Sequence, residues 1–412
     1  MIHKTQVGIV GAGPAGLMLA HLLEREGIDA VVLEARSREH VESRVRAGVL
    51  EQGTVDLLHL LGLAERMQRE GLVHHGIELG FNKNRHRIDL QDLTGNTVTV
   101  YGQHEVLKDL ILAASQRAIP IHFEATEVTV HELEGPTPYI EYEYAGTRRR
   151  LQCDYIAGCD GFHGICRPSV PFGALEIFTR EYPFSWLGIL AVAAPSQSEL
   201  VYMNSPRGFA LFSMRSPTIT RLYLQCDNHE DIAAWSDDRI WSELFLRLES
   251  NDGWKPNEGA ILQKGITPMR SFVTEPMQYG RLLLAGDAAH IVPPTGAKGM
   301  NLAISDVEFM ALALVARYRE NRSDLLQRYS EVCLRRVWKV QRFSWWMTQM
   351  LHRMPDGNAF DRRRQIAELD YVTSSRAAAL SLAENYVGLP KQYCWPAHES
   401  SRGIGYDGQD HG

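Results

Sequence analysis

The chain has 412 residues, more than one hydrophobic core usually holds, which predicts two domains. Its formal net charge of -7 gives no reason to expect binding to nucleic acid or to an anionic membrane surface. No uninterrupted apolar run approaches transmembrane length, and the six cysteines lack the paired spacing of metal ligands. The composition therefore predicts a cytoplasmic protein of a reducing compartment, with no metal site.

The first elements along the chain predict the nucleotide-binding half of an α/β protein. Residues 7–10 are typical of a buried parallel strand, and residues 15–26 have the apolar spacing of an amphipathic helix. A second strand is expected at residues 30–33, directly before Glu34. A carboxylate at this spacing accepts hydrogen bonds from a ribose hydroxyl in dinucleotide-binding proteins.

Three glycines lie between the first strand and the body of the helix, and each meets a different physical need. Gly11 permits the tight turn, Gly13 lets the backbone approach a pyrophosphate, and Gly16 allows close packing of helix and strand. The helix N-terminus then offers free N–H groups and the positive end of its dipole to the phosphates. The alternative is a glycine-rich turn that binds no nucleotide.

The middle of the chain is rich in predicted strands. The stretches GIELGF and HRIDL are typical of strands, a helix is expected within residues 101–117, and short strands follow at residues 121–156. A second strand-rich region runs over residues 182–225. Within it, FALFSMR and RLYLQC flank the turn-rich SPTIT, which predicts a β-hairpin.

Two more motifs follow in an informative order. The segment CDYIAGCDGFHG contains Asp160, and GRLLLAGDAAHIVPPTGAKGMNLAISD contains Gly286 and Asp287. Helical periodicity then dominates to about residue 382, from a helix whose first N–H groups would face a bound flavin. Together with the glycine motif, this order points to FAD and to aromatic hydroxylation. Asp287 has the alternative of a turn or N-cap aspartate.

With these residues in view, the chain resembles the single-component class A flavoprotein monooxygenases from Lys4 to about Pro390. The specific stretches are RAGVLEQG, YPFSWLG, PRGFALFSMR, HIVPPTGAKG, RFSWWMT and AENYVGLP. The resemblance implies an α/β fold: a Rossmann-like, glutathione-reductase-type FAD-binding domain interleaved with a β-sheet-rich substrate domain, followed by C-terminal helices. The expected bounds are residues 1–72, 98–179 and 269–345 for the FAD-binding domain, 73–97 and 180–268 for the substrate domain, 346–394 for a C-terminal helical and interface region, and 395–412 for a disordered tail.

The resemblance also implies an activity. Members of this family bind FAD, take electrons from NADPH or NADH, and hydroxylate with O2 through a flavin 4a-hydroperoxide; 4-hydroxybenzoate becoming 3,4-dihydroxybenzoate is the reaction expected here. Family members are homodimers, and Trp345 and Trp346 have the spacing of a core or subunit contact. Three alternatives stay open: 4-aminobenzoate as the substrate, a FAD-binding regulator that has lost hydroxylation, and a flavin reductase or oxidase.

The resemblance assigns the substrate site. Ser213, Arg215 and Tyr223 are expected to hold a carboxylate, and the hairpin supports this because residues two apart in a strand share a face. At the other end of the substrate, Tyr202 and the carbonyl of Pro294 are expected to meet the hydroxyl group.

The same resemblance assigns a proton path from Tyr202 through Tyr386 to His74, since tyrosine titrates near 10 and histidine near 6.5. His74 has the alternative of a solvent-exposed side chain. Arg221 is the expected additional cation near the flavin. The expected cofactor-binding residues are Gly11, Gly13, Gly16, Glu34, Arg46, Gln103, Asp160, Gly286, Asp287, Lys298, Gly299 and Asn301. Those expected near the nicotinamide donor are Arg44, His163, Arg270 and Arg36, with either donor accepted and a slight lean to NADPH.

Overall fold

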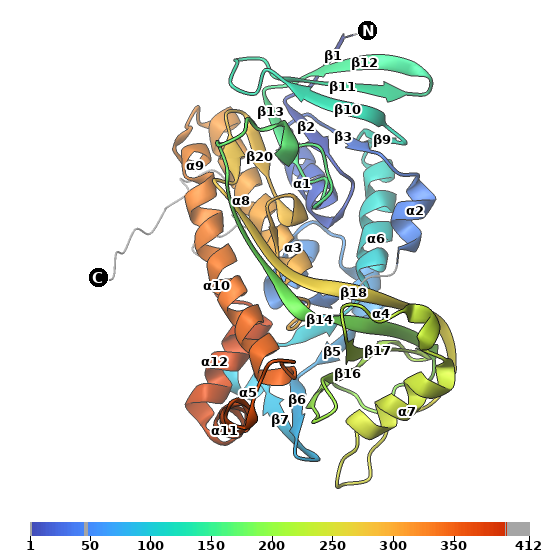
Figure 1. Ribbon diagram of the computed structural model, residues 1–412. Helices are drawn as coiled ribbons and strands as arrows, with labels where there is room; N and C mark the ends of the chain where they lie inside the picture. The colour runs from blue at the N-terminus through green and yellow to red at the C-terminus, as the bar shows by residue number, and fades with distance from the viewer. Residues whose placement is uncertain (1, 45–47, 392, 394–412) are drawn as a thin grey trace.

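The computed structural model describes residues 2–44, 48–391 and 393, and it is a mixed α/β structure with C-terminal helices, as expected (Figure 1). Arg46 and the tail expected to be disordered, residues 395–412, lie outside the described residues. In Figure 1 the six-stranded sheet lies in the upper half, and most of the larger sheet lies with the last helices in the lower half.

A six-stranded sheet forms the centre of the upper half, in the order β19-β20-β13-β2-β3-β9. All neighbours are parallel except β19, which is antiparallel to β20. The strands are β2 (Val7–Val10), β3 (Ala30–Glu34), β9 (Ile121–Phe123), β13 (Tyr155–Gly158), β19 (Gln278–Tyr279) and β20 (Leu282–Leu284). The two strands expected before Glu34 are therefore confirmed, and the pairing of β13 with β2 brings Asp160 to the same sheet edge as Gly11.

Several helices share one apolar core cluster with this sheet. They are α1 (Pro14–Arg25), α2 (Arg38–Ser43), α3 (Gln52–Leu60), α4 (Glu65–Glu70), α6 (Gln103–Gln116), α8 (Gly299–Arg319) and α9 (Asp324–Gln327). Of the described helices, α8 is long and apolar enough to cross a membrane by length and composition, with Asp306 and Glu308 interrupting its apolar residues. However, 83% of its most apolar window is buried inside the protein, as in the core helix of a globular protein.

An eight-stranded sheet forms the lower half, in the order β21-β18-β14-β17-β16-β15-β6-β7. Its strands are β6 (Gly76–Phe81), β7 (Asn84–Asp89), β14 (Glu176–Val192), β15 (Val201–Asn204), β16 (Ala210–Ser216), β17 (Ile219–Cys226), β18 (Ala260–Glu275) and β21 (His290–Ile291). The hairpin predicted around SPTIT is confirmed as β16 and β17. Strands β14 and β18 pair along almost their whole lengths and pass through the expected domain boundaries at 179/180 and 268/269.

Two small sheets and three short 3₁₀ helices complete the strand-rich parts. The four-stranded sheet contains β1 (Ile2–Lys4), β12 (Thr147–Gln152), β11 (Tyr139–Tyr144) and β10 (Thr126–His131). The three-stranded sheet contains β4 (Val49–Leu50), β8 (Val98–Val100) and β5 (Leu72–His74). The 3₁₀ helices are η1 (Arg167–Ser169), η2 (Ile232–Ala234) and η3 (Gly286–Ala288).

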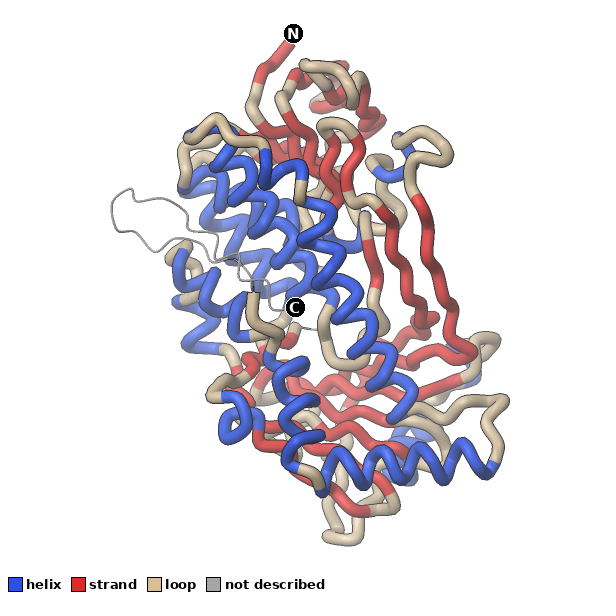
Figure 2. The backbone as a smooth tube through the Cα atoms, turned by 90° about the vertical axis from the view of Figure 1, so that its left-hand side faces the viewer, coloured by secondary structure: helices blue, strands red, loops and turns tan. Residues whose placement is uncertain are grey.

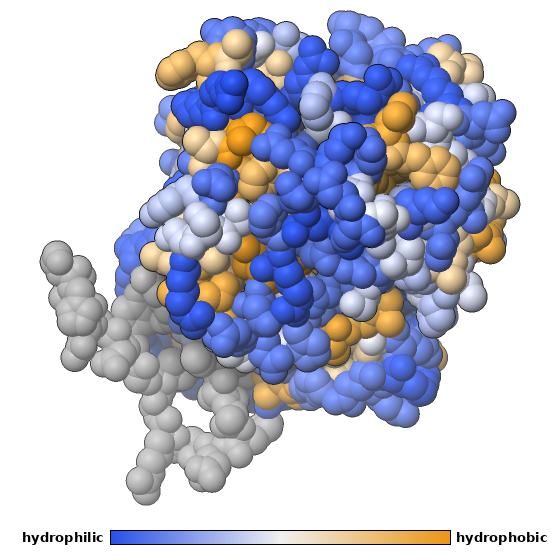
Figure 3. All heavy atoms as spheres, turned by 90° about the horizontal axis from the view of Figure 1, so that it is seen from below, coloured by the Kyte–Doolittle hydropathy of each residue, from blue (hydrophilic) through white to orange (hydrophobic). Residues whose placement is uncertain are grey.

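The remaining helices are α5 (Leu90–Thr94), α7 (Asp237–Arg247), α10 (Tyr329–Leu351), α11 (Ala359–Ser374) and α12 (Arg376–Val387). Helices gather on the side that faces the viewer in Figure 2, and long strands run along the edge of the molecule. One apolar core cluster joins the end of α10, α11 and α12 to the eight-stranded sheet. Seen from below, the described surface is mainly hydrophilic with separate hydrophobic patches (Figure 3).

Candidate active site

The glycine turn after β2 forms a cradle at the N-terminus of α1. A Cβ at Gly11 would lie 2.4 Å from the Cys159 carbonyl oxygen, and a Cβ at Gly16 would lie 2.0 Å from the Gly11 carbonyl oxygen. These two glycines are thus required by packing. A Cβ at Gly13 would meet no atom within 4 Å, and no side chain caps the helix there. The open space above Gly13 fits a phosphate group at a helix N-terminus.

Two carboxylates frame this cradle. The oxygens of Glu34 accept hydrogen bonds from the N–H groups of Ala12 and Arg36, each at 2.8 Å, so the loop holds the carboxylate at the end of β3. Asp160 accepts from the Cys166 N–H at 2.8 Å with one oxygen, while its other oxygen has no partner among the described residues. Burial raises the pKa of Asp160. Both carboxylates are placed to accept from hydroxyl groups of a nucleotide.

The third motif is fixed by a buried pair that the sequence did not reveal. Asp306 of α8 accepts from the Gly286 N–H at 3.0 Å and lies 2.6 Å from Nε2 of His290. Burial by itself would lower the pKa of His290, but the charge of Asp306 raises it. The half-buried Asp287 caps no helix end through its side chain, contrary to the N-cap alternative. The pair therefore ties the loop of Asp287 to the helix that begins at Gly299.

The N-terminus of α8 is the second open helix end. A Cβ at Gly299 would meet no atom within 4 Å, and no side chain caps the helix. The ammonium of Lys298 turns away from this end: it donates to Glu51 at 2.8 Å and to the Tyr386 carbonyl at 2.7 Å. The Asn301 amide is likewise engaged, with Val49 and Glu51. Backbone N–H groups, and not these two side chains, are what α8 offers to a cofactor.

The residues expected to form the substrate clamp lie close together on the hairpin. Ser213 is paired across the strands with Arg221, and Arg215 donates to the Ser213 hydroxyl at 2.9 Å. The guanidinium of Arg221 lies over the ring of Tyr223, 5.0 Å from its centroid. Burial would raise the pKa of Tyr223, but the charges of Arg221 and Arg215 bring it below its usual value. Nε of Arg215 and Nη1 of Arg221 are buried without a partner among the described residues, so both can still donate to an anion.

Two tyrosines lie at the other end of the site. The hydroxyl oxygens of Tyr202 on β15 and Tyr386 on α12 are 2.7 Å apart, and both side chains are buried. Burial raises the pKa of Tyr202 to about 12, while the Tyr386 hydroxyl and the charge of Arg215 act in the opposite direction. The pKa of Tyr386 is raised well above its usual value by burial and by Tyr202.

The structure excludes the solvent-exposed alternative for His74, the third member of the expected proton path. His74 is not solvent-exposed: 1% of it is accessible, and burial lowers its pKa to about 4. Neither ring nitrogen has a hydrogen-bond partner among the described residues, so the structure does not join His74 to Tyr386 directly. The Pro294 carbonyl accepts from the Ala297 N–H at 2.9 Å, which leaves one lone pair for a substrate.

The residues expected near the nicotinamide donor form two groups. His163 and Arg270 both contact the ring of Phe162, with centroid distances of 5.0 Å for each. Arg36 and Arg44 are exposed at the two ends of the segment that contains α2. Gln103 begins α6 and is half-buried, close to Gly48.

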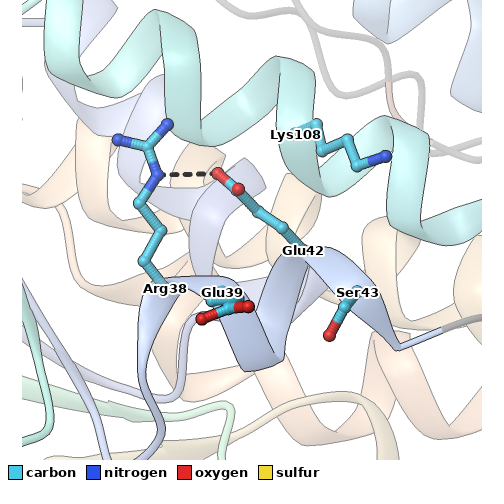
Figure 4. A pocket seen from close by; sticks show the side chains of 5 residues that line it. All are labelled: Arg38, Glu39, Glu42, Ser43 and Lys108. Atoms are coloured by element: carbon cyan, nitrogen blue, oxygen red, sulfur yellow. Dashed lines mark hydrogen bonds and ion pairs between the residues drawn. The ribbon is translucent and has the colours of Figure 1, made fainter.

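A surface hollow of about 490 Å³ lies between α2 and α6 (Figure 4). Arg38 and Lys108 line it, together with Glu39 and Glu42. Arg38 is paired with Glu42 at 2.7 Å, as the dashed line in Figure 4 marks. The two cations are thus balanced by two carboxylates. The charge of the hollow therefore favours neither NADPH, which has a phosphate on its ribose, nor NADH, which has none.

Several residues of the site carry no pattern that sequence reasoning could have used. Glu51 and Asp306 act through partners about 250 and 20 positions away respectively, as the spacing of their hydrogen bonds shows. Buried polar residues at Ser344 and Thr348 of α10 and at His352, directly after the helix, have the i, i+4, i+8 spacing of one helix face. Polar residues at that spacing within an apolar face are a signal that could have been found.

Comparison with known proteins adds the family. Residues 4–344 match the family model described as the FAD binding domain. The p-hydroxybenzoate hydroxylase of Acinetobacter baylyi is 50% identical over 388 residues, covering 94% of this chain and 96% of that protein. A probable NADH-specific resorcinol 4-hydroxylase of Rhodococcus jostii is 26% identical over 331 residues, and the match spans 75% of this chain and 58% of that protein.

A solved structure shows the same fold. The p-nitrophenol 4-monooxygenase of Pseudomonas putida superimposes with a TM-score of 0.81 at 18% identity, covering 93% of this chain and 98% of that one. The Rossmann-like FAD-binding fold with an interleaved sheet is therefore the fold of this chain as well.

Proposed function

The chain belongs to the family of FAD-dependent aromatic hydroxylases, and from this premise we propose that it hydroxylates 4-hydroxybenzoate to 3,4-dihydroxybenzoate. The reaction consumes O2, NAD(P)H and one proton, and it releases water and NAD(P)+. The substrate is proposed from one observation, which is that the site has two different ends. One end has guanidinium donors of Arg215 and Arg221 without a partner among the described residues, and the other has the buried Tyr202–Tyr386 pair. An acid at one end of a benzene ring and a phenol at the other fit these two ends.

The clamp residues select and orient the substrate. Arg215 and Tyr223 would donate to the benzoate carboxylate, with Ser213 as a third donor, and charge-assisted bonds of this kind are strong and directional. Fixing the carboxylate fixes the opposite end of a rigid ring, so the phenol oxygen lies against Tyr202. This restricts which ring carbon is presented to the cofactor.

The tyrosine pair removes the phenol proton. A phenolate donates more electron density to the neighbouring ring carbon than a phenol does, and this carbon must attack oxygen. Tyr202 accepts from the phenol and donates to Tyr386, and the proton then moves outward from Tyr386, with neutral His74 as a proposed acceptor. A para-amino substrate has no need of such a path, which places 4-aminobenzoate second.

Bound FAD carries electrons from NAD(P)H to O2 and delivers one oxygen atom to the ring. We propose that the open helix ends at Gly13 and Gly299 hold its pyrophosphate and ring, with Glu34, Asp160, Gly286, Asp287 and Gln103 beside them. His163 and Arg270, which both contact the ring of Phe162, are proposed to meet the nicotinamide donor together with Arg44 and Arg36. NADPH and NADH are both proposed donors, because the hollow beside α2 has no excess of either charge.

The experiment follows oxidation of NADPH and of NADH by the FAD-loaded protein, with and without 4-hydroxybenzoate, and identifies the product by chromatography. Strong stimulation with one 3,4-dihydroxybenzoate formed per NAD(P)H is the expected result. Stimulation with hydrogen peroxide and no catechol would show that 4-hydroxybenzoate is only an effector. No stimulation by any benzoate would favour the regulator, and equal oxidation without a benzoate would favour a reductase or oxidase.

We also propose that the protein is a homodimer in the cytoplasm. Its domains are proposed to have the bounds expected from the sequence. Trp338 and Trp345 are seven residues apart on α10 and more than two-fifths exposed, which suits a helix face that meets a second copy. Five cysteines are free and buried among the described residues, which suits a reducing compartment. Measurement of the molar mass in solution by light scattering tests the dimer.

A further inference from the structure

A continuous aromatic contact runs from the substrate clamp to the end of α10. The ring of Tyr223 packs on Trp186 of β14, with centroids 4.9 Å apart, and Trp186 packs on Phe209 at 5.2 Å. Gly188 is paired with Tyr223 and Trp186 with Gln225, so Trp186 and Tyr223 project from the same face of the sheet. Trp186 therefore supports the clamp tyrosine from beside it.

The position of Trp186 is fixed by one polar contact. Its indole N–H donates to Nε2 of His352 at 2.6 Å, and His352 has no accessible surface. The other ring nitrogen of His352, Nδ1, donates to the Thr348 carbonyl at 3.0 Å. Since Nδ1 carries the proton, Nε2 is an acceptor, and the imidazole is in the one tautomer that can receive the indole.

Three aromatic rings, of Phe184, Trp186 and Phe209, pack against the imidazole. It stacks on Phe184 with centroids 4.7 Å apart and an interplanar angle of 8°, and it lies 4.3 Å from Phe209. Burial lowers the pKa of His352 to about 3, so it stays neutral and keeps its acceptor at physiological pH. No acidic side chain is bonded to either nitrogen among the described residues.

The end of α10 and the residues that follow it are anchored to the site at two further points. Thr348 lies 3.0 Å from the Thr295 hydroxyl, next to Pro294 of the loop that the substrate hydroxyl is proposed to meet. Gln225 of β17 donates to the Arg353 carbonyl at 2.6 Å and accepts from its N–H at 3.0 Å. The end of α10 is thus fixed both to the clamp sheet and to the loop opposite it.

From these contacts we infer that His352 is a positioning residue of the benzoate clamp, which holds Trp186 against Tyr223 and so sets the affinity for the substrate carboxylate. The inference rests on the proposed function of the clamp. The residue that follows α10 would then influence substrate selection, although His352 itself contacts neither substrate nor cofactor. Without the acceptor, the buried indole N–H would have no partner, and Trp186 would turn to find one.

The test compares two ligands by calorimetry on the FAD-loaded protein: 4-hydroxybenzoate and its uncharged analogue 4-hydroxybenzamide. The variant His352→Phe keeps the aromatic stack and removes the acceptor. We expect about tenfold weaker binding of 4-hydroxybenzoate, as for a buried donor left unpaired, and little change for the amide. A merely structural role would weaken both ligands equally, and that result would overturn the inference.

A second comparison combines His352→Phe with Trp186→Phe in a double-mutant cycle. In Trp186→Phe the N–H is already gone, so adding His352→Phe should cost no further affinity for 4-hydroxybenzoate. Additive losses would overturn the inference. His21→Phe is the matched control, because His21 is another fully buried histidine bonded to a backbone carbonyl, the Leu110 oxygen at 2.8 Å.

The unaltered protein separates this inference from the proposed function. If it binds 4-hydroxybenzoate and turns it over, only the variants decide the role of His352. If it neither binds nor hydroxylates any benzoate, the proposed function fails, and the inference fails with it.

Discussion

Tyr202 and Tyr386 share a hydrogen bond of 2.7 Å between their hydroxyl oxygens, although 184 residues separate them in the chain. Tyr202 belongs to the eight-stranded sheet and Tyr386 to the last described helix, and their rings meet edge to face, with centroids 6.2 Å apart. The Tyr386 carbonyl also accepts from the Lys298 ammonium, which ties this helix to the start of α8. The hydrogen bond therefore forms only where the eight-stranded sheet, α12 and the start of α8 meet.

Replacing Tyr386 by Phe should impair proton removal without removing the substrate. The clamp remains, so binding of 4-hydroxybenzoate should stay within about threefold, while hydroxylation at neutral pH should fall by about 100-fold, the usual size of a lost proton-transfer group. The fraction of bound phenolate, measured from its ultraviolet absorption, should fall with it. Tyr182→Phe, which removes a bond to Ser271 only, is the control. A variant that hydroxylates at the wild-type rate would remove Tyr386 from the path.

Replacing Arg215 by Ala should abolish the carboxylate clamp. A buried charged donor lost from an ion pair typically costs about 3 kcal/mol, which corresponds to an affinity loss of more than 100-fold. FAD content should be unchanged, because no cofactor-binding element contacts this side chain through a hydrogen bond in the described residues. Arg207→Ala, which breaks an exposed pair with Glu243 beside the same sheet, is the control for calorimetry. Unchanged affinity would place the carboxylate elsewhere.

Gly13→Ala should separate cofactor binding from folding. The added Cβ meets open space and the backbone angles suit any residue, so the melting temperature without FAD should not change. The methyl group would, however, occupy the space expected for the pyrophosphate, so FAD affinity should fall by at least tenfold, or about 1.4 kcal/mol. Gly16→Ala, whose Cβ collides with the Gly11 carbonyl, should instead destabilise the protein itself. Equal FAD affinity in Gly13→Ala and wild type would move the pyrophosphate away from this turn.

Three buried histidines should make the fold sensitive to acid. Burial lowers the pKa to about 4 in His21 and His74 and to about 3 in His352. The unfolded chain binds protons near pH 6.5, so stability is complete above that pH and is lost as the pH falls toward 4. At pH 5 each histidine should cost about 2 kcal/mol.

Urea unfolding at pH 7 and pH 5 measures this effect. His21→Leu should lose about 2 kcal/mol less than wild type between the two pH values, since the titrating group is gone. The surface variant His229→Ala is the control. Identical losses in wild type and His21→Leu would show that this histidine is protonated in the folded state.

The sequence by itself determined the local parts of this protein. Gly11, Gly13, Gly16 and Glu34 are placed by the geometry of one turn, and the hairpin of β16 and β17 follows from strand alternation around a turn; both are present as predicted. These features depend on residues that are near one another in the chain, so spacing is enough to predict them. The clamp and the tyrosine path were proposed from family resemblance, and spacing alone would not have joined Tyr202 to Tyr386.

Tertiary packing alone decided the rest. Lys298 was expected at the cofactor, but the fold places Glu51 beside it, and a buried ammonium binds the nearest carboxylate. His74 is buried rather than exposed, because the eight-stranded sheet and Arg215 lie close to it. The contact of Trp186 with His352 joins residues 166 positions apart. Which polar groups meet inside a core depends on how whole helices dock on a sheet, and no local pattern in the chain records that.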